Sequence, residues 1–188
     1  MSVRLTWPNV LTLLRIALIP VFVLIFLLPY AWAPPVTCLI FALAGITDWL
    51  DGYLARRFNE SSAFGKFLDP VADKLMVTTA LVLLLSYDPR LWLTISVIII
   101  VGREITISAL REWMAELGVG KHIAVSFVGK IKTTVQMLAI GFMLFQYDLG
   151  PIHAYAIGVV LLFAAAGLTL WSMVLYLLAA WPDLSRDG

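Results

Sequence analysis

The sequence AYAIGVVLLFAAAGLTLWSMVLYLLAA occupies residues 154–180 and contains no charged residue. This run is longer than the ~20 residues that a helix needs to cross the hydrocarbon core of a bilayer. Because lipid offers no water to the backbone, a spanning segment must be a helix or a strand of a closed barrel. The alternating apolar and polar residues of a barrel strand do not occur here. The stretch therefore predicts a membrane-spanning helix, with apolar character over residues 152–181.

Five similar apolar segments precede this one. We place them at 9–29, 35–57, 70–87, 91–112 and 123–146, separated by clusters of turn-forming residues. Hydrophobic residues make up 62% of the 188 residues, above the roughly 45–50% typical of soluble domains. We predict an all-α integral membrane protein, a six-transmembrane-helix bundle that forms a single domain over residues 1–188.

The first segment has an alternative interpretation as a cleaved signal peptide. It holds a short apolar core, and Ala31-Trp32-Ala33 imitates a cleavage site. We favour a retained helix, because Asn9, Thr12 and Arg15 fall on one helix face and resemble part of a site. These three residues are accessory candidates that either contact phosphate or close a cavity.

The basic residues are distributed unevenly along the chain. Twelve of the thirteen Lys and Arg residues lie near the start of an odd-numbered segment or the end of an even-numbered one, and only Arg90 does not. By the positive-inside rule, both termini should be cytoplasmic. The charges that intrude into the apolar runs lie at this same face, which predicts a polar cavity at the cytoplasmic side. Ionisable groups at membrane depth are functional candidates.

Four carboxylates stand at this face. Asp48 and Asp51 end the second segment three residues apart, and Asp69 and Asp73 begin the third four residues apart. Each pair shares a helix face, and antiparallel neighbouring helices can bring the pairs together. Carboxylates at close range repel one another unless they take up protons or bind cations. Oxygen-only ligands favour Mg²⁺ or Mn²⁺, and two such ions would balance the four charges.

Some neighbouring residues also have simpler interpretations. Gly52, Ala55 and Gly65 would let a substrate approach the backbone, but small residues at such intervals also serve helix packing. Pro70 after Asp69 is typical of a helix start, so that acid could be an N-cap. An N-cap would explain one acid of the four.

A second cluster is basic and lies at the cytoplasmic ends of the fourth and fifth segments. Its members are Arg103, Arg111, Lys130 and Lys132. Such cations would bind a phosphate-bearing alcohol. Lys and Arg also commonly flank membrane helices. That explanation fits Arg103 poorly, because it adjoins Glu104 within an apolar run.

The pattern Asp48-x2-Asp51-Gly52-x2-Ala55-Arg56-x8-Gly65-x3-Asp69-x3-Asp73 resembles the signature of the CDP-alcohol phosphatidyltransferases, membrane enzymes of phospholipid synthesis. The resemblance implies a homodimer of six-helix chains, in which an alcohol attacks the β-phosphorus of a CDP-linked lipid and releases CMP. It implies two divalent metal ions, Mg²⁺ or Mn²⁺, on Asp48, Asp51, Asp69 and Asp73, with Asp73 also as catalytic base. The implied CDP-binding residues are Asp48, Gly52, Ala55, Arg56 and Gly65.

Three further stretches refine this resemblance. Residues 102–105, 108–113 and 129–133 are similar to those of the family's bacterial phosphatidylglycerophosphate synthases, as are Pro8-Asn9 and residues 11–15. The implied donor is CDP-diacylglycerol, the acceptor is sn-glycerol 3-phosphate, and the product is phosphatidylglycerol phosphate. The implied location is the bacterial cytoplasmic membrane, with the active site on its cytoplasmic side. The implied acceptor-phosphate residues are Arg103, Arg111, Lys130 and Lys132.

Two alternatives stay open at this point. The same chemistry could use serine, inositol phosphate or a second phospholipid as acceptor. A divalent-cation or proton-coupled transporter is the alternative from another class, since carboxylates inside a helix bundle also mark ion pathways. A transporter should carry polar groups through the whole membrane, whereas the outer halves here are apolar. The sequence has no acidic or basic tail of the kind that indicates nucleic-acid binding. The expected partners are the two substrates, membrane lipids and a second copy of the chain.

Overall fold

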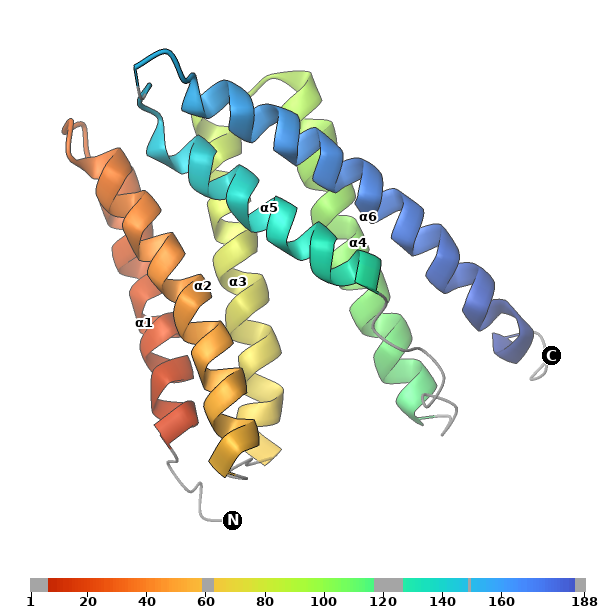
Figure 1. The fold of residues 1–188 in the computed structure, drawn as a ribbon. Coiled ribbons are helices and arrows are strands. Elements are labelled where there is room, and N and C mark those ends of the chain that lie inside the picture. Colours follow the sequence, from red (N-terminus) through yellow and green to blue (C-terminus); the bar gives the residue numbers. More distant parts are fainter. Residues whose placement is uncertain (1–6, 59–62, 117–126, 149, 185–188) are drawn as a thin grey trace.

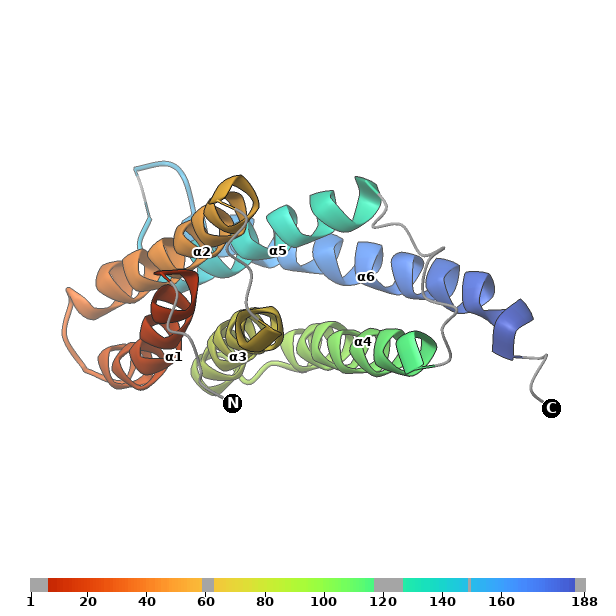
Figure 2. The same ribbon diagram turned by 90° about the horizontal axis from the view of Figure 1, so that it is seen from below.

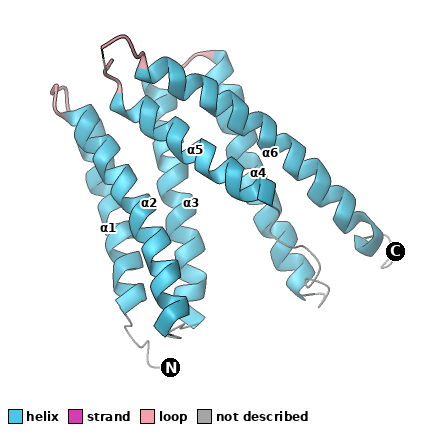
Figure 3. Ribbon diagram, in the orientation of Figure 1, coloured by secondary structure: helices cyan, strands magenta, loops and turns pink. Residues whose placement is uncertain are grey.

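A computed structural model of the chain describes residues 7–58, 63–116, 127–148 and 150–184. Within these ranges the structure contains six helices and no strand (Figure 3). The helices are α1 (Trp7–Phe26), α2 (Ala33–Phe58), α3 (Ala63–Tyr87), α4 (Leu91–Glu116), α5 (Phe127–Phe145) and α6 (Ala154–Leu184). The all-helical prediction is confirmed.

Successive helices run in opposite directions (Figure 1). The connections from α1 to α2, from α3 to α4 and from α5 to α6 lie at one end of the bundle. The starts of α1, α3 and α5 lie at the other end, together with the ends of α2, α4 and α6. The helix ends that carry most of the basic residues, and the acids of α2 and α3, are therefore on the same side of the molecule.

The helices form two layers. Seen along the bundle, α1, α3 and α4 lie in one layer and α2, α5 and α6 in the other (Figure 2). Contacts between neighbours agree with this arrangement: α3 packs against α1 and α4, and α5 packs against α2 and α6. The layers are joined by contacts of α1 with α2, of α4 with α6, and of α3 with α2 and α5. This places α3 and α5 at the centre.

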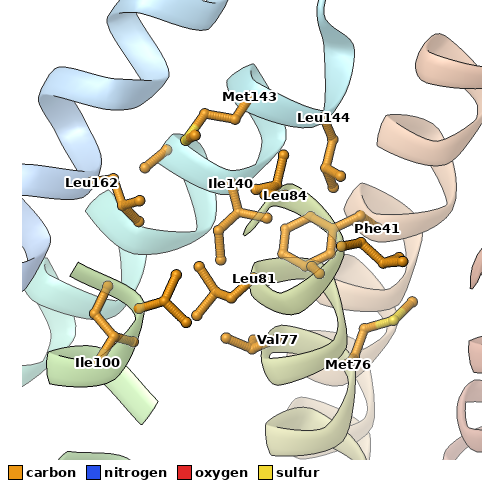
Figure 4. Packing of buried hydrophobic residues seen from close by; sticks show 14 of the residues in the cluster. Phe41, Met76, Val77, Leu81, Leu84, Ile100, Ile140, Met143, Leu144 and Leu162 are labelled. Atoms are coloured by element: carbon orange, nitrogen blue, oxygen red, sulfur yellow. The ribbon is translucent and has the colours of Figure 1, made fainter. Parts of the chain in front are cut away.

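The apolar core lies where α3 and α5 meet (Figure 4). Leu81 and Leu84 of α3 and Ile140 and Leu144 of α5 are fully buried there. The surrounding helices α1, α2, α4 and α6 complete the packing with Phe22, Phe41, Ile100 and Leu162, in that order. The core therefore holds all six helices together around the site described below.

The outer surface suits a lipid environment. Three helices carry apolar stretches long enough to cross a membrane, at Pro70–Tyr87, Leu91–Leu110 and Ala154–Leu175. The apolar stretches described in α1, α2 and α5 are shorter. Large side chains such as Leu24 and Val160 are about two-thirds exposed, at 65% and 67%. Extended apolar surfaces of this kind are rare on soluble monomers, and the chain is a membrane protein.

The third helix begins earlier than the apolar pattern indicates. It starts at Ala63, whereas the apolar pattern predicts a start at residue 70. Its first two turns include Gly65, Lys66 and Asp69, so they extend the helix without extending the apolar run. Asp69 is therefore inside α3 and is not its N-cap, and Pro70 lies within the helix. The simpler interpretation of Asp69 is wrong for this reason.

A polar cluster closes the end of the bundle that carries few basic residues. Both oxygens of Asp88 accept hydrogen bonds from Arg90, each of 2.6 Å, and the Tyr155 hydroxyl donates to Oδ2 at 2.6 Å. The bonds from Arg90 lower the pKa of Asp88 to about 2, with a smaller contribution from Tyr155. This cluster connects the turn between α3 and α4 to the start of α6.

Candidate active site

A large cavity lies between α2 and α5, with a volume of about 750 Å³. Its polar lining consists of Asp48, Asp73, Thr133 and Thr134, apart from the half-buried thiol of Cys38. Farther along the two helices the lining is apolar, from Gly45 and Phe41 on α2 and from Met137, Gly141 and Phe145 on α5. Because α2 and α5 are antiparallel, the acids and threonines share one end of the cavity. A polar mouth thus leads into a long apolar groove.

Asp48 is held by a residue of the first helix. Nη1 of Arg15 donates a 2.7 Å hydrogen bond to Oδ1 of Asp48. The Arg15 side chain is 3% exposed, and that of Asp48 is 42% exposed. Thr12, one turn before Arg15, is also fully buried. Two of the three accessory candidates therefore lie inside the bundle, and α1 contributes directly to the site.

A second, smaller cavity of about 70 Å³ adjoins the first. Asp73, Thr133 and Met137 line both cavities, so Asp73 lies between them. Lys74, Glu104 and Gln136 add polar groups to the smaller cavity. Nζ of Lys74 also donates a hydrogen bond to Oγ of Ser108, which connects α3 to α4.

Two of the predicted phosphate-binding cations meet at one carboxylate. Oε1 of Glu104 accepts hydrogen bonds from Nη1 of Arg103 at 2.7 Å and from Nζ of Lys132 at 3.1 Å. Arg103 and Lys132 are both buried, and Nη2 of Arg103 lies 3.5 Å from Oγ of Ser172 on α6. The cluster therefore spans α4, α5 and α6.

Sequence reasoning did not include Glu104 in the site. The signal was present, because an acid inside an apolar run is unfavourable in lipid unless it faces a partner or a cavity. Gln136 and Lys74 were missed for another reason. Gln136 is an uncharged residue within an apolar run, and Lys74 fits the basic residues of a cytoplasmic helix end. Only the packing of α3 against α4 and α5 shows that both line the smaller cavity.

Several predicted site residues belong to described helices, but their side chains lie outside the described part of the structure. They are Asn9, Asp51, Gly52, Ala55, Arg56, Gly65, Asp69, Arg111 and Lys130. The helix backbones still constrain two of them. Asp51 is one turn beyond Asp48 on the unbroken α2, and Asp69 is one turn before Asp73 on α3. The convergence of all four acids stays a prediction.

The chemistry of the cavity mouth suits a hard divalent cation. Asp48 and Asp73 come from different helices and line the same cavity. Carboxylate oxygens are the ligands that Mg²⁺ and Mn²⁺ prefer. Within the described residues, no group of three or more His, Cys, Asp or Glu side chains is placed to hold a metal ion. A complete ligand set would need Asp51 and Asp69.

Comparison with known proteins agrees with this architecture. The family model described as CDP-alcohol phosphatidyltransferase matches residues 5–182. The chain is 54% identical over 177 residues to a Salmonella typhimurium protein named CDP-diacylglycerol–glycerol-3-phosphate 3-phosphatidyltransferase, covering 94% of this chain and 96% of the relative. An Escherichia coli protein of the same name is 52% identical over the same length and coverage.

The family match spans all six helices, including α1 with Arg15 and the two helices that carry Asp48 and Asp73. The matched region includes all four acids of the signature, and two of them, Asp48 and Asp73, line the mouth of the large cavity. The chain belongs to the CDP-alcohol phosphatidyltransferase family.

Proposed function

We propose that this enzyme transfers the phosphatidyl group of CDP-diacylglycerol to sn-glycerol 3-phosphate, giving phosphatidylglycerol phosphate and CMP. The names of the relatives that are 52% and 54% identical state this donor, this acceptor and this transfer. The alignment with these relatives covers 94% of this chain and 96% of theirs, so the proposed donor and acceptor sites both lie within the matched region.

The observation that carries the proposal is the form of the large cavity. CDP-diacylglycerol has a charged diphosphate at one end and acyl chains at the other. The cavity has Asp48 and Asp73 at its mouth and an apolar groove along α2 and α5. The acyl part of the donor would occupy the groove, while the diphosphate stays at the mouth. Ligand sites in proteins are typically lined by apolar side chains with a small number of placed polar groups, as this cavity is.

The reaction requires a nucleophile and neutralisation of the diphosphate. Two divalent ions on Asp48, Asp51, Asp69 and Asp73 would neutralise the diphosphate and the leaving CMP. Asp73 takes the proton of the acceptor hydroxyl while the oxygen of that hydroxyl attacks the β-phosphorus. The bond between that phosphorus and the CMP oxygen then breaks. Gly52, Ala55, Arg56 and Gly65 would surround the cytidine diphosphate.

The acceptor enters from the basic side of the site. Arg103 and Lys132 supply positive charge near the smaller cavity, which Asp73 also lines. Arg111 and Lys130 would add further contacts to the phosphate of the acceptor. A phosphate held by these cations would place the glycerol hydroxyl near Asp73, because the smaller cavity has that acid in its wall.

We further propose that all six helices span the bacterial cytoplasmic membrane and that the enzyme is a homodimer. The concentration of basic residues at one end of the bundle supports a cytoplasmic site and cytoplasmic termini. An active site at that depth lets the donor lipid keep its acyl chains in the bilayer while the headgroup reaches the acids.

The decisive experiment uses purified protein in detergent with CDP-diacylglycerol, Mg²⁺ and glycerol 3-phosphate. We expect equimolar CMP and phosphatidylglycerol phosphate, and no product when the metal is chelated. Serine, inositol phosphate and a second phospholipid serve as competing acceptors in parallel reactions. CMP release with one of these, and not with glycerol 3-phosphate, would contradict the proposed acceptor. Cation flux in proteoliposomes without CMP release would favour the transporter.

A further inference from the structure

Glu104 occupies an unusual position between two buried cations. Its Oε1 accepts from Nη1 of Arg103 at 2.7 Å and from Nζ of Lys132 at 3.1 Å. Because both nitrogens bind the same oxygen, Nη1 of Arg103 and Nζ of Lys132 can be no farther apart than the sum of these two distances. Arg103 belongs to α4 and Lys132 to α5, so the arrangement exists only in the folded bundle.

Burial makes this arrangement restrictive. The side chains of Arg103 and Lys132 are 9% and 2% exposed, while that of Glu104 is 30% exposed. A buried cation needs a charged or strongly polar partner. Oε1 of Glu104 already holds Arg103 and Lys132 together. The phosphate of an acceptor would be a second anion that both cations could bind. The carboxylate also lines the smaller cavity, as Asp73 does.

We propose that Glu104 is a positioning residue for the acceptor. It holds Arg103 and Lys132 at a fixed separation, so that the two cations bind one phosphate monoester as a unit next to Asp73. This inference rests on the proposed function, because it assumes an acceptor that carries a phosphate. Glu104 itself does not contact the reacting atoms and acts through the two cations.

The test compares Glu104→Gln with the wild type. The amide keeps the size of the side chain and removes its charge, so its oxygen can still accept hydrogen bonds but holds the two cations more weakly. We expect the KM for glycerol 3-phosphate to rise about tenfold, because the hydrogen bonds that orient the two cations weaken when their acceptor loses its negative charge. The KM for CDP-diacylglycerol should stay within about twofold, because the donor groove is formed by other residues. Asp148→Asn, which removes the charge of an exposed acid at the opposite end of the bundle, is the control and should leave both values unchanged.

A second variant and a binding measurement separate positioning from a structural role. Glu104→Asp keeps the charge but is one methylene shorter, so it should raise the acceptor KM less than the Gln variant does. Without donor lipid, glycerol 3-phosphate should raise the unfolding temperature of the wild type, and raise that of Glu104→Gln less at the same concentration. If the Gln variant does not fold, the Asp variant carries both measurements.

Two outcomes would overturn this inference. One is an acceptor KM that does not rise in either variant: an unchanged KM would mean that Glu104 does not position the cations, and a lower one that it competes with phosphate for them. The other is an equal rise of both KM values, as a general loss of structure would produce. Failure of the proposed function appears differently, because the wild type itself would then form no phosphatidylglycerol phosphate.

Discussion

Arg15 of α1 and Asp48 of α2 form an ion pair of 2.7 Å in which the arginine is almost completely buried and the acid remains open to the large cavity. The two residues are 33 positions apart. Arg15 therefore occupies one oxygen of Asp48 and orients the carboxyl group toward the cavity mouth. The first helix is part of the site for this reason.

Replacement of Arg15 by Ala should weaken the use of the donor lipid. Asp48 would lose the donor that fixes its orientation, and we expect kcat/KM for CDP-diacylglycerol to fall by about tenfold, or ~1.4 kcal/mol of transition-state stabilisation. Steady-state kinetics in detergent measures this. Leu14→Ala, at a position on the same helix that is 54% exposed, is the control. Equal effects of the two variants would argue against a specific role for the ion pair.

Replacement of Asp73 by Asn should abolish turnover while much of the binding of the donor lipid remains. The amide keeps an oxygen at the position but cannot accept the proton of the acceptor hydroxyl. CMP release and binding of labelled CDP-diacylglycerol measure the two effects separately. Asp148→Asn, at the opposite end of the bundle and 54% exposed, should retain normal activity. Near-normal turnover of Asp73→Asn would remove the proposed base.

Arg111→Ala and Lys130→Ala should each raise the KM for glycerol 3-phosphate more than the KM for CDP-diacylglycerol. Each variant removes one cation that would contact the acceptor phosphate, an interaction worth roughly 1.5–3 kcal/mol, or about 10- to 150-fold. Varying one substrate at saturating levels of the other gives the two KM values. A parallel loss for both substrates would show that these residues do not form an acceptor pocket.

Gly141→Leu should obstruct the apolar groove without disturbing the fold. A Cβ at Gly141 meets no atom within 4 Å, and this glycine lines the large cavity. We expect poor turnover of long-chain CDP-diacylglycerol and better turnover of a short-chain analogue. Gly167→Leu is the control, because its Cβ is equally unobstructed and it does not line the cavity. Equal chain-length dependence in both variants would place the acyl chains elsewhere.

Gly158→Ala should destabilise the contact between α5 and α6. A Cβ there would lie 2.8 Å from the carbonyl oxygen of Ala139 and 2.9 Å from the amide nitrogen of Met143, both backbone atoms that cannot turn aside. Overpacking of this kind typically costs ~1–3 kcal/mol, and helices in lipid depend on such close packing. Thermal unfolding in detergent should show a lower midpoint than for Gly167→Ala. An unchanged midpoint would mean that the two helices separate easily.

Much of this protein is determined by local sequence. The apolar runs specify helices because lipid leaves the backbone no other partner for its hydrogen bonds. The spacing of Asp48 and Asp51, and of Asp69 and Asp73, follows from the helical period alone. Together with the small residues between them, these acids form a signature that indicates the family. The start of α3 was missed because its first turns are polar, and an apolar pattern marks the membrane-facing part of a helix rather than its full length.

The tertiary structure alone decided which of these residues act together. Arg15 pairs with Asp48 because α1 packs against α2, and Glu104 binds Lys132 because α4 and α5 both line the smaller cavity beside α3. Such contacts depend on the rotation of each helix about its axis and on the distance between helices. Sequence spacing fixes the face on which a residue lies, but the close packing of six helices determines which faces meet.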